Sequence, residues 1–182
     1  MCIRDRCRTI DIHETDLSLR KIFSIIFLLV YGCNNNSLDL EVVSGSEFFN
    51  NMSKIHTSKI ILVNIWSTWC EPCIEEFPYV VGLEKKYDAN DLDVIFFSVD
   101  WDEQSKEARS FLKDQQVTGK HYRKQDGDDQ LFINAFSTEW TGAIPFTVLY
   151  DRNGELLTQW EGKRSESYFY TKIDSLLTLF GS

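Results

Sequence analysis

The stretch from Ile60 to Pro78 constrains the fold more than any other part of the chain. It begins with an apolar, largely β-branched run, passes through a short turn, and reaches Cys70 and Cys73, which are separated by Glu-Pro. Apolar β-branched runs of this kind are typical of buried strands. An amphipathic run follows, with apolar residues at Ile74, Phe77, Val80, Val81, Leu83 and Tyr87. The predicted order is a buried strand, a turn, a Cys-x-x-Cys pair and a helix.

This order suits dithiol chemistry. A cysteine at or just before a helix N-terminus has its thiolate stabilised by unpaired N–H groups and by the helix dipole. Pro72 fits the first helical turn, because its missing N–H is not needed there. Two intervening residues bring the second sulfur within disulfide reach. The pattern predicts that Cys70 attacks a substrate disulfide and that Cys73 resolves the mixed disulfide.

Other interpretations of the cysteine pair have to be weighed. A zinc site needs about two more Cys or His ligands at short spacing, and the mature chain offers only His56 and His121, far apart. Haem attachment requires a histidine directly after the second cysteine, where this chain has Ile74. A purely structural disulfide is the main alternative, which the flanking tryptophan and Pro72 disfavour. We therefore expect no metal and no cofactor.

Charge and cysteine usage narrow the function further. The 182 residues carry a net charge of −9, and an acidic surface argues against nucleic-acid binding. Of the five cysteines, Cys2, Cys7 and Cys33 precede the domain, and only Cys70 and Cys73 lie within it. A domain with one such pair uses it for redox chemistry more often than as a structural disulfide.

The N-terminal segment predicts an export signal. Two basic residues precede the apolar run Ile22–Tyr31, and a small residue and a cysteine follow. This pattern is typical of a signal peptide, and the run is shorter than the roughly 20 residues of a spanning helix. Val30–Cys33 is similar to a bacterial lipobox, which implies lipidation of Cys33 after cleavage; an uncleaved or weakly anchoring signal is the alternative. Asn34–Ser37 is polar and is expected to be a tether.

The residues before Leu19 are acidic and poor in apolar side chains, which does not fit a signal peptide. Met1–Arg6 is similar to the translation of a transposase-end sequencing adapter. We therefore expect an artefactual start, a true start near Leu19, and no function for Cys2 and Cys7. Mass spectrometry that finds residues 1–18 on the native protein would refute this. In outline, residues 1–37 are artefact, signal and tether, and residues 38–182 form one domain.

The rest of the domain predicts alternating strands and helices, and hence an α/β fold. Leu92–Asp100 is nearly continuously apolar, as expected of a parallel strand covered on both faces. Trp101, just after it, is expected either to line a substrate groove or to pack in the core. The other predicted elements are a strand at 38–43, a helix at 45–56, a helix at 103–115, a strand at 121–124, a helix at 131–136, a hairpin of 146–150 and 155–160, and a closing helix at 165–180 with Phe180 facing inward.

Two separated motifs resemble the thioredoxin superfamily, and more narrowly the TlpA/ResA-type extracytoplasmic thiol–disulfide oxidoreductases. The first is Trp69–Cys73, followed by Glu76-Phe77-Pro78. The second is Gly142–Pro145 before the apolar run Phe146–Tyr150, which is similar to the family's cis-proline strand. The resemblance covers about residues 38–180. It implies a thioredoxin-like fold, with a central mixed β-sheet flanked by helices and a cis proline before an antiparallel strand.

The resemblance also implies the site residues. Asn64 stands where cytosolic thioredoxins carry a buried acid, so the family implies Glu76 as the proton shuttle. A cis Ile144–Pro145 bond would offer backbone N–H and C=O groups to an extended substrate. The implied set is the redox-active disulfide Cys70–Cys73, with Cys70 as nucleophile and Cys73 as resolving residue, the shuttle Glu76, and a substrate-binding surface of Trp69, Glu71, Pro72, Ile144 and Pro145.

The direction of electron flow is predicted from charge. Glu71, Glu75 and Glu76 crowd the pair, and like charge disfavours a thiolate, which favours a reductant. The resemblance points the same way, to reduction of exported proteins in cytochrome c maturation or repair, with a membrane electron donor. We therefore expect a periplasmic or cell-envelope protein anchored through lipidated Cys33. The alternatives are a disulfide-forming oxidase, a thiol peroxidase and a non-catalytic binding module.

Overall fold

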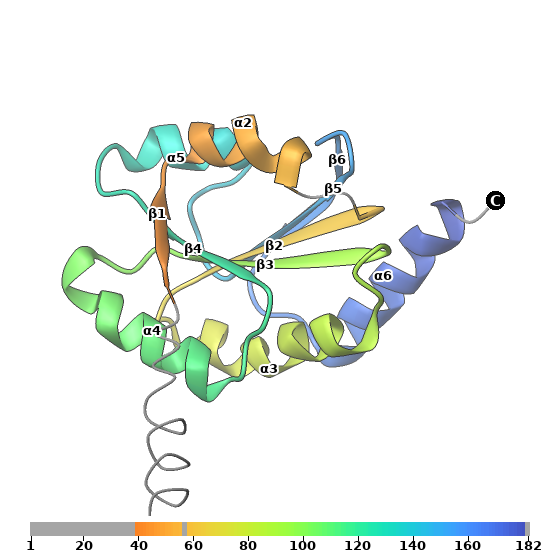
Figure 1. Cartoon of the computed structure of the whole chain (residues 1–182), viewed down its shortest axis with the longest axis horizontal. Coiled ribbons are helices and arrows are strands. Elements are labelled where there is room, and N and C mark those ends of the chain that lie inside the picture. The colour runs from red at the N-terminus through yellow and green to blue at the C-terminus, as the bar shows by residue number, and fades with distance from the viewer. Residues whose placement is uncertain (1–38, 56–57, 181–182) are drawn as a thin grey trace, which may run out of the picture. The chain divides into compact units, whose positions relative to one another are not determined.

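A six-stranded sheet forms the centre of the domain in the computed structural model, which describes residues 39–55 and 58–180 (Figure 1). Strands β1, β4, β3 and β2 are parallel to one another, whereas β5 is antiparallel to β2 and β6 is antiparallel to β5. The mixed sheet that the sequence predicts is therefore confirmed. Its order is β1 (Glu41–Val43), β4 (Lys120–Lys124), β3 (Leu92–Ser98), β2 (Ile60–Trp66), β5 (Phe146–Asp151) and β6 (Leu156–Glu161).

Strand β2 lies in the interior of the sheet, between β3 and β5, and all seven of its residues are buried. Its side chains alternate between two hydrophobic clusters, as the pleat of a strand requires. Ile61, Val63 and Ile65 pack with α2 (Gly45–Ile55) and α5 (Asp129–Phe136). Ile60, Leu62 and Trp66 pack on the other face, which is covered by α3 (Glu71–Lys86), α4 (Ser105–Asp114) and α6 (Glu166–Phe180) (Figure 1). Burial on both faces explains why the run in the sequence is apolar at every position except Asn64.

Several boundaries and one burial prediction differ from expectation. Strand β3 ends at Ser98 rather than Asp100, and the helix expected from Glu103 begins at Ser105, after a 3-10 turn, η1 (Asp102–Gln104). Phe180 is exposed rather than inward, because the last buried side chain of α6 is Ile173, about two turns earlier. The predicted leader, Cys33 and His56 lie outside the described residues. No helix in the described part of the chain is long and apolar enough to cross a membrane.

Candidate active site

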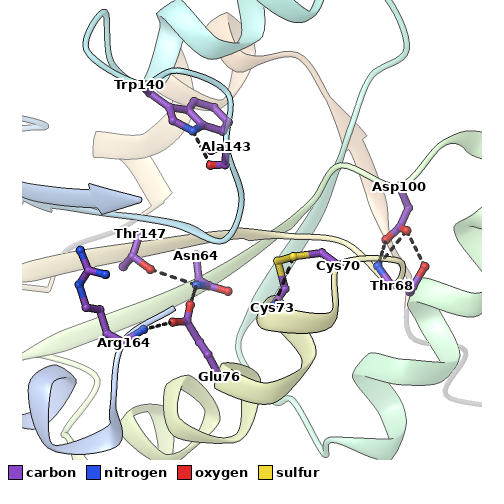
Figure 2. The surroundings of a disulfide bond; sticks show 10 residues. All are labelled: Asn64, Thr68, Cys70, Cys73, Glu76, Asp100, Trp140, Ala143, Thr147 and Arg164. Atoms are coloured by element: carbon purple, nitrogen blue, oxygen red, sulfur yellow. Dashed lines mark hydrogen bonds between the residues drawn. A yellow bond between two sulfur atoms is a disulfide. The ribbon is translucent and has the colours of Figure 1, made fainter. Parts of the chain in front are cut away.

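The two cysteines lie where β2 passes into α3 (Figure 2). Cys70 is the N-cap residue of α3, and its sulfur accepts a hydrogen bond from the Cys73 backbone N–H at 3.3 Å. Pro72 lies in the first turn, where the sequence places it. The sulfurs form a disulfide. Cys70 is 6% exposed and Cys73 is 1% exposed, so an external sulfur meets Cys70 first.

Glu76 lies one turn after Cys73 on α3 and is fully buried. Its two carboxylate oxygens accept hydrogen bonds from Asn64 Nδ2 at 3.1 Å and from the Arg164 backbone N–H at 2.8 Å (Figure 2). Asn64 Nδ2 also donates to Thr147 Oγ1 at 3.1 Å, because these residues face each other across β2 and β5.

Burial raises the pKa of Glu76 from its ordinary value of 4.5 to about 7, although both hydrogen-bond donors oppose the shift. A carboxyl group with this pKa both accepts and releases protons readily at neutral pH. The position suits a group that exchanges a proton within the site.

The negative charge beside the disulfide is smaller than the sequence suggests. Glu75 forms an ion pair with Lys163, from the loop between β6 and α6. Glu76 is only partly ionised at neutral pH because of its raised pKa. Of the three glutamates that the sequence places here, Glu71 is exposed on the first turn of α3. Within residues 39–55 and 58–180, no three His, Cys, Asp or Glu side chains are grouped as metal ligands.

Asp100 is a buried carboxylate to which the sequence assigned no role. It follows β3, and its oxygens accept hydrogen bonds from the Thr68 N–H at 3.0 and 3.2 Å and from Thr68 Oγ1 at 2.6 Å (Figure 2). They also accept one from Ser98 Oγ at 2.7 Å. It therefore fixes Thr68 in the turn that leads directly into Cys70. The available signal was an acid directly after a parallel strand, at the sheet edge where ligand sites gather in α/β folds.

Replacing Asp100 with alanine is expected to lower the free energy of unfolding by about 2 kcal/mol, because the partly buried Thr68 N–H and the buried Ser98 hydroxyl would lose their acceptor. Denaturant unfolding of the oxidised protein measures this loss. Asp114→Ala is the matched control, since the Asp114 side chain is exposed at the end of α4. Equal losses in the two variants would show that the Thr68 contacts contribute nothing specific.

The segment before β5 forms the opposite wall of the site. The Ile144–Pro145 peptide bond is cis. The Pro145 carbonyl accepts a hydrogen bond from the Gly162 N–H at 2.8 Å. The carboxylate of Glu161, at the end of β6, accepts from the Thr141 N–H at 2.6 Å and from Thr141 Oγ1 at 2.9 Å. The end of β6 thus holds the segment at two points.

A pocket of about 210 Å³ is lined by Trp69, the residue directly before Cys70, and by Ile144, and both belong to the predicted substrate-binding set. Of the other three, Pro145 is buried, whereas Glu71 and Pro72 are exposed on α3. Trp101, for which the sequence left two environments open, is exposed and lines the same pocket, so the core alternative is wrong.

Comparisons with known proteins agree with this geometry. Residues 50–172 match the family model described as Redoxin. The chain is 32% identical over 124 residues to the thiol:disulfide interchange protein HelX of Rhodobacter capsulatus, which covers 68% of this chain and 64% of HelX. It is 27% identical over 108 residues to the thiol-disulfide oxidoreductase ResA of Bacillus thuringiensis, which covers 59% of this chain and 58% of ResA.

Among solved structures, a thiol:disulfide interchange protein of the thioredoxin family from Chlorobium tepidum aligns with a TM-score of 0.56 at 22% identity, covering 74% of this chain and 90% of that protein. That similarity establishes the fold. The chain spans less than two thirds of the length of the two curated relatives it matches here.

Proposed function

Since the chain belongs to the redoxin family and is a TlpA/ResA-type member of the thioredoxin superfamily, we propose that it is a thiol–disulfide oxidoreductase that reduces disulfides of exported proteins. The observation that carries this proposal is the disulfide at the start of α3, with Cys70 the more exposed of the two cysteines and the titratable Glu76 buried one turn behind Cys73. The names of HelX and ResA support the same reaction class.

The reaction proceeds from the reduced protein in two displacements. The Cys70 thiolate attacks a substrate disulfide, forms a mixed disulfide and releases the first substrate thiol. Glu76 takes the proton of the Cys73 thiol, and the Cys73 sulfur then attacks Cys70. This step restores the Cys70–Cys73 bond and releases the second substrate thiol. Two electrons pass from the dithiol to the substrate in each cycle.

The burial of Cys70 favours the reducing direction. Cys70 is only 6% exposed, desolvation disfavours a thiolate, and a dithiol whose thiolate is not stabilised is the stronger reductant. Each cycle consumes two electrons, so a donor must reduce the disulfide again. We assign this part to a membrane-bound thiol–disulfide relay.

We further propose that the protein resides in the cell envelope, in the periplasm or its equivalent, and is anchored through a lipid on Cys33. The support is the basic, apolar and lipobox-like pattern of residues 20–33. Mass spectrometry of the native protein should find a diacylglyceryl group on Cys33, and Cys33→Ser should move the protein from the membrane to the soluble fraction. A membrane-bound Cys33→Ser protein would contradict the lipid anchor.

The reduction potential of the Cys70–Cys73 pair tests the direction of the reaction. The measurement uses a variant in which Cys2, Cys7 and Cys33 are serine, so that only this pair titrates. A potential near roughly −270 mV, as in thioredoxin, is expected of a reductase. A potential near roughly −120 mV would instead mean a disulfide-forming oxidase. Consumption of peroxide at a substantial rate would mean a thiol peroxidase.

A further inference from the structure

The pocket that Trp69 and Ile144 line has aromatic walls. Trp69, directly before Cys70, stacks on Trp101 with ring centroids 5.7 Å apart and an interplanar angle of 21°. The two side chains are 50% and 59% exposed, which is unusual for the largest apolar residues. The pocket is also lined by Phe132 and Ile133 of α5, and by Trp140 and Ile144 of the segment before β5.

The wall formed by Trp140 is preorganised. Its ring stacks on Phe146 with centroids 4.5 Å apart and an angle of 8°, and its Nε1 donates to the Ala143 carbonyl at 2.8 Å (Figure 2). Thr141, the next residue, is held by Glu161. A ligand that enters this pocket therefore meets a rigid surface and does not have to order it, which lowers the entropic cost of binding.

The size of the pocket limits what can occupy it. Its volume of about 210 Å³ is below the range of roughly 300–1,000 Å³ that holds a drug-sized ligand or cofactor. The pocket has room for one large side chain of a protein substrate. Aromatic walls favour an aromatic guest, because ring pairs gain more than their buried area alone.

The rim of the pocket presents negative charge to solvent. The carboxylates of Asp126 and Asp129, which line the pocket, are 58% and 81% exposed. Their cationic partners, Arg123 and Lys124, are only 4% and 13% exposed. An approaching chain therefore meets the carboxylates first, and a cationic residue next to the guest side chain is favoured over an anionic one.

We propose that this pocket selects the substrate, by binding an aromatic side chain that lies close to the attacked cysteine and is itself next to a lysine or arginine. The inference deepens the proposed function and rests on it, since the pocket acts only if Cys70 exchanges with a protein disulfide. The selected class is a basic, aromatic-flanked cysteine segment. The reaction is unchanged: the peptide disulfide gains two electrons and leaves as two thiols, and the Cys70–Cys73 bond forms.

Single-turnover reduction of designed peptides tests this proposal. The fully reduced protein is mixed with short peptides that are each closed by one disulfide and flanked by Phe-Lys, Ala-Lys or Phe-Glu. One series carries the pair before the first cysteine and another carries it after the second. The reaction is quenched with acid, and the reduced peptide is quantified by chromatography.

In whichever of the two series reacts faster, the Phe-Lys peptide is expected to react about tenfold faster than the Ala-Lys peptide at subsaturating concentration. It should also react several-fold faster than the Phe-Glu peptide, and this second ratio should shrink in high salt. Trp101→Ala and Ile133→Ala should each reduce the preference for phenylalanine towards unity. The double variant Asp126→Asn, Asp129→Asn should remove the preference for lysine.

Matched controls separate the pocket from general effects. Leu131→Ala removes another exposed apolar side chain of α5 that lies outside this pocket, and it should keep both preferences. Asp114→Asn, at the end of α4, should keep the charge preference. Equal rates for all peptides in both series, or preferences that survive the pocket variants, would overturn the inference while leaving the reductase intact. Failure to reduce any peptide would instead remove the proposed function itself.

Discussion

Replacing Cys73 with serine is expected to leave the protein covalently joined to its substrates. Cys70 would still attack, but no second thiol would release the mixed disulfide, because Cys73 is the only other cysteine in the described domain. Turnover should fall by about 10³-fold or more, since effects of this size follow the loss of a residue that acts in the covalent chemistry. Non-reducing electrophoresis of cells that express the variant, followed by mass spectrometry of adducts on Cys70, measures the trapping.

Cys70→Ser is the matched control for this experiment. Within the domain it retains one thiol, that of Cys73, but this thiol is almost completely buried, so few or no adducts on the domain are expected. The double variant Cys70→Ser, Cys73→Ser should capture no partner. If the double variant still bound wild-type partners without a covalent bond, the domain would be a binding module instead. If abundant Cys73→Ser protein formed no adduct in cells, the proposed attack by Cys70 would be wrong.

Replacing Glu76 with glutamine is expected to change the pH dependence of both stability and catalysis. The folded protein holds the Glu76 proton up to a pKa of about 7, whereas the unfolded chain releases it near 4.5. Between these values the folded state binds more protons, so the free energy of unfolding decreases as pH rises from 4.5 to 7 and then levels off. A shift of this size corresponds to about 3 kcal/mol across the window.

In Glu76→Gln this decrease should disappear, which denaturant unfolding of the oxidised protein at a series of pH values measures. The absolute stability near pH 5 should fall, because both oxygens of Glu76 accept hydrogen bonds and an amide nitrogen would face Asn64 or Arg164 without an acceptor. Glu75→Gln is the control. Glu75 is the neighbouring acid and forms only a surface ion pair with Lys163, so the slope should persist in that variant.

Catalysis by the same variant distinguishes a proton-transfer role from a structural one. In the wild-type protein, release of substrate from the mixed disulfide should accelerate with pH around an apparent pKa near 7, because the ionised Glu76 accepts the Cys73 proton. Glu76→Gln should lose this inflection and slow the release step by about 10²-fold near neutral pH, while the initial attack by Cys70 is little changed. An unchanged inflection would assign the proton acceptor to another group.

Much of the site is already visible in the sequence because it is local. Cys70, Pro72 and Cys73 lie within four consecutive positions, and their placement at the start of α3 follows from helix geometry alone. The buried strand β2 is predicted by a run that is apolar at every position except Asn64, as expected of a strand covered on both faces. Glu76 is also local, since helical periodicity places it one turn from Cys73.

Other parts of the site depend on contacts between distant segments. The sequence marks Asp100 as an acid after a strand, but its hydrogen bonds to Thr68 arise because the ends of β2 and β3 meet at one edge of the sheet. The charge estimate from Glu71, Glu75 and Glu76 was too negative for the same reason. Lys163 neutralises Glu75 across 88 residues of sequence, and burial by the sheet and α6 raises the pKa of Glu76.

The sequence by itself therefore determined the dithiol, the helix that begins at it, the central strand and the thioredoxin-like class, because each depends on short-range periodicity, on residue type, or on motifs in a fixed order. Only the tertiary structure decided the ionisation of Glu76, the exposure of Trp101 and the pocket that it lines with Trp69, Trp140 and Ile144. These properties depend on which surfaces exclude water, and that is set by segments that meet only when the sheet has formed.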